Sequence, residues 1–290
     1  MFKGVYTALV TPLENNKFDE KSFIELLETQ IKAGVSGVVP CGTTGESPTL
    51  SYEEHHYIIK LCIDYCKDKV QVLAGTGSNS TDEALATTQY AQECGADAAL
   101  LVTPYYNKPS QQGLYEHFKK IHDNTDIPII LYNIPGRCMV NISMELLVEL
   151  AKLSRIIGVK DATSDLTLPG LVRKELGEGF CQLSGEDATM LAFNIAGGHG
   201  CISVVANIVP KLCVEMQSAW FAGNIKKAQE IQEKLVEISQ VLFCETNPVP
   251  VKYAASLVGL CSAELRLPLV LPGKESKDKI ELALKNLNLI

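Results

Sequence analysis

The sequence predicts an α/β fold, a (β/α)8 TIM barrel with a C-terminal helical extension. Eight short apolar segments recur about every 30 residues, with closer spacing toward the end. Amphipathic segments with helix start and stop signals lie between them. A length of 290 residues accommodates one domain of this size.

The eight candidate strands are apolar along their whole length instead of alternating between apolar and polar residues. This pattern is typical of parallel strands that helices cover on both faces. Each strand ends in polar or glycine-containing sequence. The predicted strands span residues 4–12, 37–42, 70–77, 98–106, 128–135, 156–162, 181–187 and 200–207.

Several helix boundaries can be predicted from capping residues. The first helix is expected between Asp19 and Gly34, because the apolar residues between them fall on one helical face. Segments 51–54 and 80–83 have the S-x-x-E spacing of a capping box, in which serine and glutamate satisfy free N–H groups at the helix start.

The C-terminal part of the chain reads as helices. We divide the chain into a catalytic barrel over residues 1–223 and a helical region over 224–290, with helices expected at 225–243, 248–260 and after Pro272. No low-complexity linker precedes this region, so we expect it to pack against the barrel.

Composition and charge exclude several classes of function. The net charge is −8, which disfavours nucleic-acid binding because that requires clustered Lys and Arg. The N-terminal segment lacks the cleavage site of a signal peptide, and no apolar run approaches the roughly 18 residues of a membrane span. We therefore expect a cytoplasmic protein.

The cysteines and histidines predict neither a disulfide framework nor a metal site. The ten cysteines are scattered singly, with no C-x-x-C motif, and most stand in apolar sequence such as GCISVV and VLFCE. Reduced cysteines in the core are the expected state. His55 and His56 are adjacent and so point to different helical faces, unlike the i, i+4 pair of zinc proteases. No metal or organic cofactor is expected.

In a barrel of this kind the active site lies at the carboxyl ends of the strands. The polar residues predicted at those ends form a short set: Gly42-Thr43-Thr44-Gly45-Glu46, Tyr105-Tyr106, Tyr132-Asn133 with Arg137, Lys160-Asp161 and Gly185-Glu186.

Lys160 is the candidate nucleophile. It lies inside a predicted apolar strand, where burial lowers the pKa of an amine, and a free amine can condense with a ketone to form a Schiff base. Tyr132 ends the preceding strand and could move the protons that this chemistry requires. Two alternatives remain: Lys160 pairs structurally with Asp161 or another carboxylate, and Tyr132 is a packing residue.

The turn at residues 42–45 presents backbone N–H groups and two hydroxyls that could hold a carboxylate. It lacks the lysine of a P-loop, so a nucleotide-phosphate site is disfavoured.

These segments resemble the family of Schiff-base pyruvate aldolases, which includes N-acetylneuraminate lyases and dihydrodipicolinate synthases. The resemblance covers essentially the whole chain, and its six short motifs occur in order. They are Gly42-Thr43-Thr44-Gly45-Glu46, Pro104-Tyr105-Tyr106-Asn107-Lys108-Pro109, Tyr132-Asn133-Ile134-Pro135-Gly136-Arg137, Gly158-Val159-Lys160-Asp161-Ala162, Leu183-Ser184-Gly185-Glu186-Asp187 and Asn247-Pro248-Val249-Pro250-Val251-Lys252.

The resemblance implies catalytic roles for four residues. Lys160 would form the imine with pyruvate, and Tyr132, Thr43 and Tyr106 would form a proton relay. Members of the family with this relay lend Tyr106 to a neighbouring subunit's site. A homotetramer built from tight dimers is therefore implied.

The resemblance also implies the substrate contacts. Thr44 and its neighbour in the turn would hold the pyruvate carboxylate, while the backbones of Gly185 and Ile202 would line the pocket. Arg137 would receive the carboxylate of L-aspartate 4-semialdehyde, and its guanidinium suits that group. Arg137 also favours the synthases of lysine and diaminopimelate biosynthesis, because lyases acting on sugar acids usually carry an uncharged residue there.

Two other functions remain open. The chain could be a related aldolase acting on a 2-keto sugar acid, or a barrel that binds a metabolite without catalysis. The second alternative predicts loss of the lysine or of the tyrosine relay, and both are present.

A second site implied by the resemblance is the pocket where some members bind lysine as a feedback inhibitor. Two residues have structural alternatives: Glu83 could serve the capping box, and His55 could lie on a helix surface. Tyr52 stands where some inhibited members have a histidine. The matching positions are Ser47, Pro48, His55, Asn79, Glu83 and Tyr105.

Overall fold

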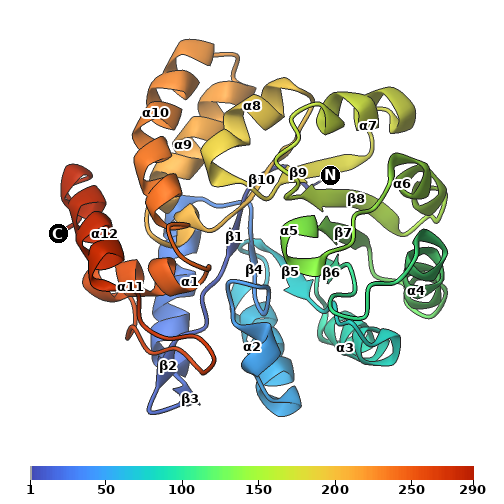
Figure 1. Cartoon of the computed structure of the whole chain (residues 1–290), viewed down its shortest axis with the longest axis horizontal. Coiled ribbons are helices and arrows are strands. Elements are labelled where there is room, and N and C mark those ends of the chain that lie inside the picture. Colours follow the sequence, from blue (N-terminus) through green and yellow to red (C-terminus); the bar gives the residue numbers. More distant parts are fainter. Residues whose placement is uncertain (1) are drawn as a thin grey trace.

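Eight parallel strands close into a barrel in the computed structural model, which describes residues 2–290 (Figure 1). The predicted fold class is confirmed, and each strand begins within one residue of its predicted start. In barrel order from β1 the neighbours are β10, β9, β8, β7, β6, β5 and β4. The strands are β1 (Gly4–Ala8), β4 (Gly37–Val39), β5 (Gln71–Gly75), β6 (Ala98–Val102), β7 (Ile129–Asn133), β8 (Ile156–Asp161), β9 (Cys181–Ser184) and β10 (Gly200–Ser203).

Helices follow every barrel strand and surround the barrel (Figure 1). The long ones are α1 (Glu20–Ala33), α2 (Tyr52–Cys66), α3 (Thr81–Cys94), α4 (Gln111–Asp123), α6 (Met144–Ala151), α7 (Leu168–Leu176), α8 (Met190–Ile195) and α9 (Pro210–Phe221). Shorter pieces are α5 (Pro135–Cys138) and the 3-10 turns η1 (Ser47–Thr49), η2 (Asp187–Thr189) and η3 (Val205–Asn207). The antiparallel hairpin of β2 (Leu13–Glu14) and β3 (Lys17–Phe18) was not predicted.

Helix α1 begins and ends where its capping residues predict. The Asp19 side chain accepts the N–H of Ser22, and Gly34 ends the helix with a φ of 81°, which glycine adopts without steric cost. The box at Ser51 and Glu54 is complete.

The second predicted capping box is only half formed. Ser80 Oγ accepts the N–H of Glu83 at 3.4 Å, but the Glu83 carboxylate accepts the Ser78 hydroxyl at 2.8 Å instead of returning to Ser80. The Ser80 N–H is already satisfied by Ser78 Oγ at 3.1 Å, which explains the difference.

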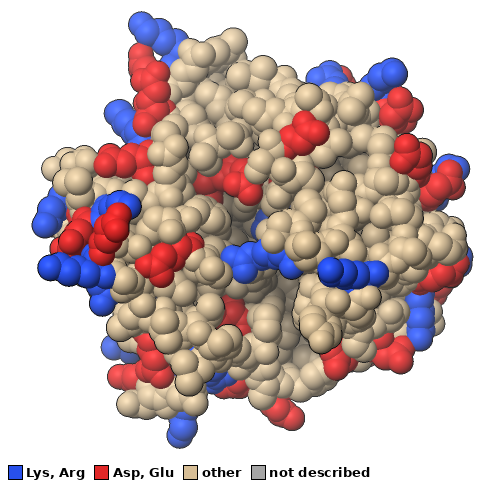
Figure 2. Space-filling model, in the orientation of Figure 1, with Lys and Arg blue, Asp and Glu red and all other residues tan. Residues whose placement is uncertain are grey.

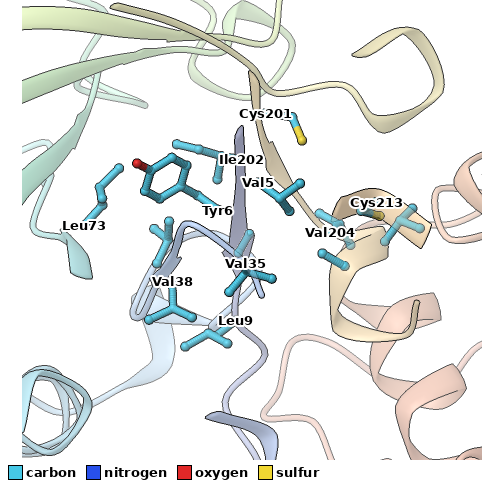
Figure 3. Packing of buried hydrophobic residues seen from close by; sticks show 14 of the residues in the cluster. Val5, Tyr6, Leu9, Val35, Val38, Leu73, Cys201, Ile202, Val204 and Cys213 are labelled. Atoms are coloured by element: carbon cyan, nitrogen blue, oxygen red, sulfur yellow. The ribbon is translucent and has the colours of Figure 1, made fainter. Parts of the chain in front are cut away.

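Side chains of β1 alternate between the barrel interior and the surrounding helices. Tyr6 lies opposite Ile202 in the register with β10, and its hydroxyl donates to Gln71 Oε1 at the start of β5. Val5 pairs with Cys201 and points the other way, toward Cys213 of α9 (Figure 3). All of these side chains except Gln71 are at most 1% exposed, so burial of apolar surface stabilises both sides of β1.

The C-terminal region consists of α10 (Ile225–Val241), α11 (Val249–Leu257) and α12 (Lys274–Asn286). Helix α10 packs against α9 of the barrel and against α12, while α11 reaches η3 beside β10. These helices lie against one side of the barrel (Figure 1). The three predicted helices are present, and the domain boundary at residue 223 stays a prediction.

All ten cysteines are free, and seven of them are buried. Cys244 is exposed, so the prediction that its apolar neighbours indicate a core position was wrong. Helix α10 ends at Val241, and Cys244 follows in the turn, outside the apolar stripe of the helix.

Among residues 2–290, no three His, Cys, Asp or Glu side chains are grouped as metal ligands would be. In the same range, none of the helices combines the length and apolar character that crossing a membrane requires.

Candidate active site

Lys160 and Tyr132 face each other across two neighbouring strands. The parallel register of β7 and β8 pairs Tyr132 with Lys160, which puts both side chains on the same face of the barrel wall. The Lys160 Nζ atom lies 4.0 Å from the centre of the Tyr132 ring. The predicted neighbourhood of nucleophile and phenol is therefore present.

Lys160 is 6% exposed, and no carboxylate oxygen in residues 2–290 lies within 4.0 Å of its Nζ atom. The proposed pair with Asp161 is not formed, because that carboxylate accepts the N–H of Thr163 at 2.8 Å. Burial lowers the pKa of Lys160 to about 8, against the opposing effect of the Asp187 and Glu186 carboxylates. About half of the amine is then free at pH 8, compared with under about 1% for an ordinary lysine.

Thr43 lies in the turn after β4 and lines the same cavity as Tyr132, and its side chain is close enough to influence the Tyr132 phenol. Burial raises the pKa of Tyr132, although the nearby Thr43 side chain and the charge of Arg137 lower it in part. The phenol is therefore protonated at neutral pH, so it can donate a proton as well as pass one on.

The turn that carries Thr43 and Thr44 is held close to β5. Cys41 has a φ of 55°, and Gly45 and Ser47 both donate their N–H groups to the Gly42 carbonyl. A Cβ atom at Gly75 of β5 would lie 2.4 Å from the Cys41 carbonyl oxygen, so only glycine permits this approach.

A cavity of about 220 Å³ opens at the carboxyl ends of β4 to β7. Its lining includes Thr43, Tyr132 and Arg137 of the predicted active site. Figure 2 shows a hollow near the middle of this face, with Lys and Arg side chains beside it. A larger hollow of about 590 Å³ lies near the amino end of β5 and contains none of the predicted site residues. We place the site in the first cavity, because barrels carry their chemistry at the carboxyl ends of the strands.

Arg137 lies in α5 at the cavity, and its guanidinium donates to the carbonyl of Asn247 at 2.8 Å. Thr44 is buried, and its hydroxyl accepts the Asn247 side-chain N–H at 3.0 Å. One residue of the C-terminal region thus contacts both groups that were predicted to hold substrate carboxylates.

The other predicted pocket residues lie deeper or elsewhere. Gly185 donates its N–H to the Asp161 carbonyl at 2.6 Å, and Ile202 is 1% exposed inside the barrel. The residues that line the 220 Å³ cavity include neither of these two nor Thr44. Tyr106 is 89% exposed and has a φ of 71°, so its chain does not bring it to Tyr132.

Three contributors near the site were not predicted: Asn247, Asp187 and the ion pair of Glu46 with Lys252. Asp187 is buried and accepts hydrogen bonds from the Ser203 hydroxyl and from the N–H groups of Val204 and Val205. The available sequence signal was that all four residues belong to motifs of the family resemblance, and that Lys252 is a charged residue in apolar sequence.

Three of the six predicted lysine-pocket residues line the same cavity, and the other three lie next to residues that line it. Ser47, Pro48 and Tyr105 line it, and Asn79 donates to the Tyr105 carbonyl at 3.2 Å. The charge of Glu83 acts on the Tyr105 hydroxyl.

The interpretation of His55 as a helix-surface side chain was wrong. Its ring points toward β5, where Nε2 lies 2.8 Å from the carbonyl oxygen of Gly75, and Gly75 itself lines the cavity. Burial lowers the pKa of His55.

A buried amine beside a phenol at the carboxyl end of a barrel defines the class of Schiff-base barrel enzymes. The model of the dihydrodipicolinate synthetase family matches residues 1–287, and the chain belongs to this family. The family resemblance in the motifs is thereby confirmed.

Curated relatives agree over the full chain. The 4-hydroxy-tetrahydrodipicolinate synthases of Parvibaculum lavamentivorans and Rhodospirillum centenum are 53% and 52% identical to this chain, and each alignment covers 100% of both proteins.

Solved structures of similar proteins share the fold of this chain. The dihydrodipicolinate synthase of Acinetobacter baumannii in complex with pyruvate matches with a TM-score of 0.97 at 41% identity, over 100% of both chains. The enzyme of Cyanidioschyzon merolae with lysine bound matches with a TM-score of 0.96 at 33% identity, over 100% of this chain and 99% of that one.

Proposed function

We propose that the protein condenses pyruvate with L-aspartate 4-semialdehyde to form 4-hydroxy-tetrahydrodipicolinate in lysine and diaminopimelate biosynthesis. The observation that carries this proposal is the buried amine of Lys160, which lies 4.0 Å from the centre of the Tyr132 ring and has no carboxylate of residues 2–290 within 4.0 Å. The relatives' names supply the product, and a similar solved structure holds pyruvate. The family resemblance implies the semialdehyde, and the geometry supports the chemistry.

The reaction begins when Lys160 Nζ attacks the ketone carbon of pyruvate and water leaves to form the imine. The imine accepts electrons, so a proton leaves the methyl carbon and an enamine forms. The enamine carbon attacks the aldehyde, and the new oxyanion takes a proton. The amino group of the condensed product then attacks the imine carbon and displaces the lysine, which closes the ring.

Three hydroxyl groups move the protons in this proposal. Tyr132 lies against Lys160, and Thr43 acts on the Tyr132 phenol and continues the relay toward the cavity. Tyr106 completes it from a neighbouring subunit. The Tyr106 ring is exposed and its backbone is left-handed. A left-handed backbone costs about 1–3 kcal/mol and persists where surrounding structure holds it. Both features support a contact with a neighbouring subunit.

The carboxylates of the two substrates have separate partners. The turn at Thr43 and Thr44 holds that of pyruvate, and Arg137 receives that of the semialdehyde while the Asn247 carbonyl orients its guanidinium. Gly185 and Ile202 shape the inner wall.

The working enzyme is a homotetramer built from two tight dimers, in the cytoplasm. Tyr106 lies at one proposed contact. An exposed apolar surface lies at α7 and the end of α8, which meet where Gly170 approaches the Ala196 carbonyl. Its apolar side chains are 38–57% exposed: Leu166, Leu171 and Ile195. This surface is suited to a second subunit contact.

The decisive experiment measures pyruvate consumption with and without L-aspartate 4-semialdehyde, with borohydride trapping followed by mass spectrometry. We expect turnover only when the aldehyde is present. Trapped pyruvate without turnover would favour the aldolase acting on 2-keto sugar acids, which a panel of such acids would then test. If borohydride traps no adduct, the result would favour the alternative of a barrel that binds a metabolite without catalysis.

The acid side of the pH-rate profile is expected to report the pKa of Lys160. Below about pH 8 the rate constant kcat/KM for pyruvate should fall as the amine becomes protonated. Glu186→Gln removes a negative charge that stabilises the ammonium, so the pKa of Lys160 should fall and the acid limb should move to lower pH. Asp187 and Arg137 also act on this amine and remain unchanged.

Glu178→Gln is the matched control for this pH profile, because Glu178 is exposed in the turn before β9, at the opposite end of the barrel. An acid limb that stays in place or moves to higher pH in Glu186→Gln would contradict the assignment.

We further propose that the end of the cavity at Ser47, Pro48, His55, Asn79, Glu83 and Tyr105 binds L-lysine. Glu83 supplies a carboxylate for an ammonium group, and the Tyr105 hydroxyl and Asn79 amide supply polar contacts. Millimolar L-lysine should slow the enzyme, and Glu83→Gln should weaken this inhibition at least about tenfold, since a charge-assisted hydrogen bond is lost. An unchanged rate in millimolar lysine would contradict the proposal.

A further inference from the structure

A buried ion pair connects the C-terminal region to the turn that carries Thr43. The Lys252 Nζ atom of α11 lies 2.5 Å from Glu46 Oε1, and the two side chains are 0% and 1% exposed. They are 206 residues apart in the sequence. Burial lowers the pKa of Lys252, while the charge of Glu46 opposes this effect.

The same turn is held by a second and a third contact from the C-terminal region. Asn247, five residues before Lys252 and just ahead of α11, donates to Thr44 Oγ1 at 3.0 Å. The Arg266 backbone N–H donates to Glu46 Oε2 at 3.1 Å. Both oxygens of the Glu46 carboxylate therefore have partners, and both partners lie beyond residue 250.

Stability alone does not account for this pair. A buried ion pair loses the hydration of both charges, and well-packed apolar side chains are often as stabilising in its place. A hydrogen-bonded ion pair differs from apolar packing because it holds its two partners in one relative position. Glu46 also has a φ of 56°, a left-handed conformation that few residues other than glycine adopt.

We propose that Glu46 and Lys252 are positioning residues of the pyruvate site, an inference that rests on the proposed function. Their ion pair holds the 42–46 turn against α11, so that Thr43 meets Tyr132 and the turn is placed to receive the pyruvate carboxylate. The C-terminal region thereby becomes part of the catalytic machinery, although none of its side chains reacts.

The test is the double variant Glu46→Met/Lys252→Met, which removes both charges and retains apolar volume. We expect it to fold with a Tm close to that of the wild type, yet to form the borohydride-trapped pyruvate adduct at least about tenfold more slowly. The KM for pyruvate should rise, because the turn no longer holds its geometry. The double variant Glu275→Met/Lys279→Met is the matched control, since it removes an exposed Glu–Lys pair in α12.

The outcomes separate the two proposals. If the wild type traps no pyruvate, the proposed function is wrong. If the wild type and the folded Met/Met variant trap pyruvate at the same rate, the pair is not a positioning device. If the Met/Met variant does not fold, Glu46→Asp takes its place, because it keeps the charge but shortens the reach to Lys252; unaltered trapping by Glu46→Asp would overturn the inference.

Discussion

Lys160→Ala is expected to lose the trapped pyruvate adduct completely and to reduce condensation at least about a thousandfold. The amine is the only protein group in the proposed mechanism that forms a covalent bond to pyruvate, and removal of a covalent nucleophile costs most of the rate enhancement. The measurement combines mass spectrometry after borohydride treatment with the coupled turnover assay. Intact fold should be verified by circular dichroism.

Two further variants make this result specific. Lys160→Arg keeps a long cationic side chain but has no amine that condenses with a ketone, so it should be as inactive as the alanine variant. Lys152→Ala, at the exposed end of α6, should retain full activity. A trapped adduct that persists in Lys160→Arg would place the nucleophile on another lysine.

Tyr106→Phe subunits are expected to recover activity when they are mixed with Lys160→Ala subunits. Each variant should be nearly inactive alone, because one lacks the relay hydroxyl and the other lacks the nucleophile. In a mixed dimer, the Tyr106→Phe subunit keeps its own Lys160 and receives an intact Tyr106 from its partner. With random exchange at equal amounts, half of the dimers are mixed and one of their two sites is complete, so about a quarter of wild-type activity should return.

The matched control replaces Tyr106→Phe with Tyr132→Phe. Tyr132 and Lys160 of one chain face each other, so no mixed dimer can assemble a complete site from these two variants. This mixture should stay inactive. Absence of recovery in the Tyr106→Phe mixture, under conditions where mass spectrometry detects mixed dimers, would show that the site is not shared.

The barrel and the reactive pair were predictable because their signals are local. A strand buried on both faces requires a continuous apolar run, and the residues at its carboxyl end must line the mouth of the barrel. Lys160 and Tyr132 occupy equivalent places at the ends of two consecutive strands. Parallel neighbours in a regular barrel bring such places together, and the register of β7 and β8 does so.

The half-formed capping box and the position of His55 were less predictable, since more than one partner competes for each polar group. Glu83 has the spacing for a capping box, yet Ser78 takes its carboxylate. His55 has the sequence context of an amphipathic helix surface, but its ring turns inward to the Gly75 carbonyl. Sequence spacing shows which contacts are possible, whereas packing selects among them.

The local pattern of the chain was therefore enough for the fold class, the positions of the strands and the candidate nucleophile with its phenol. The contacts of Asn247 with Thr44 and of Lys252 with Glu46 were decided only when the chain folded. They join segments 203 and 206 residues apart, and no periodicity or spacing relates such segments. Their partners are chosen by the way α11 packs onto the barrel, because a charge or amide that packing buries must find its partner among the groups that the same packing brings near.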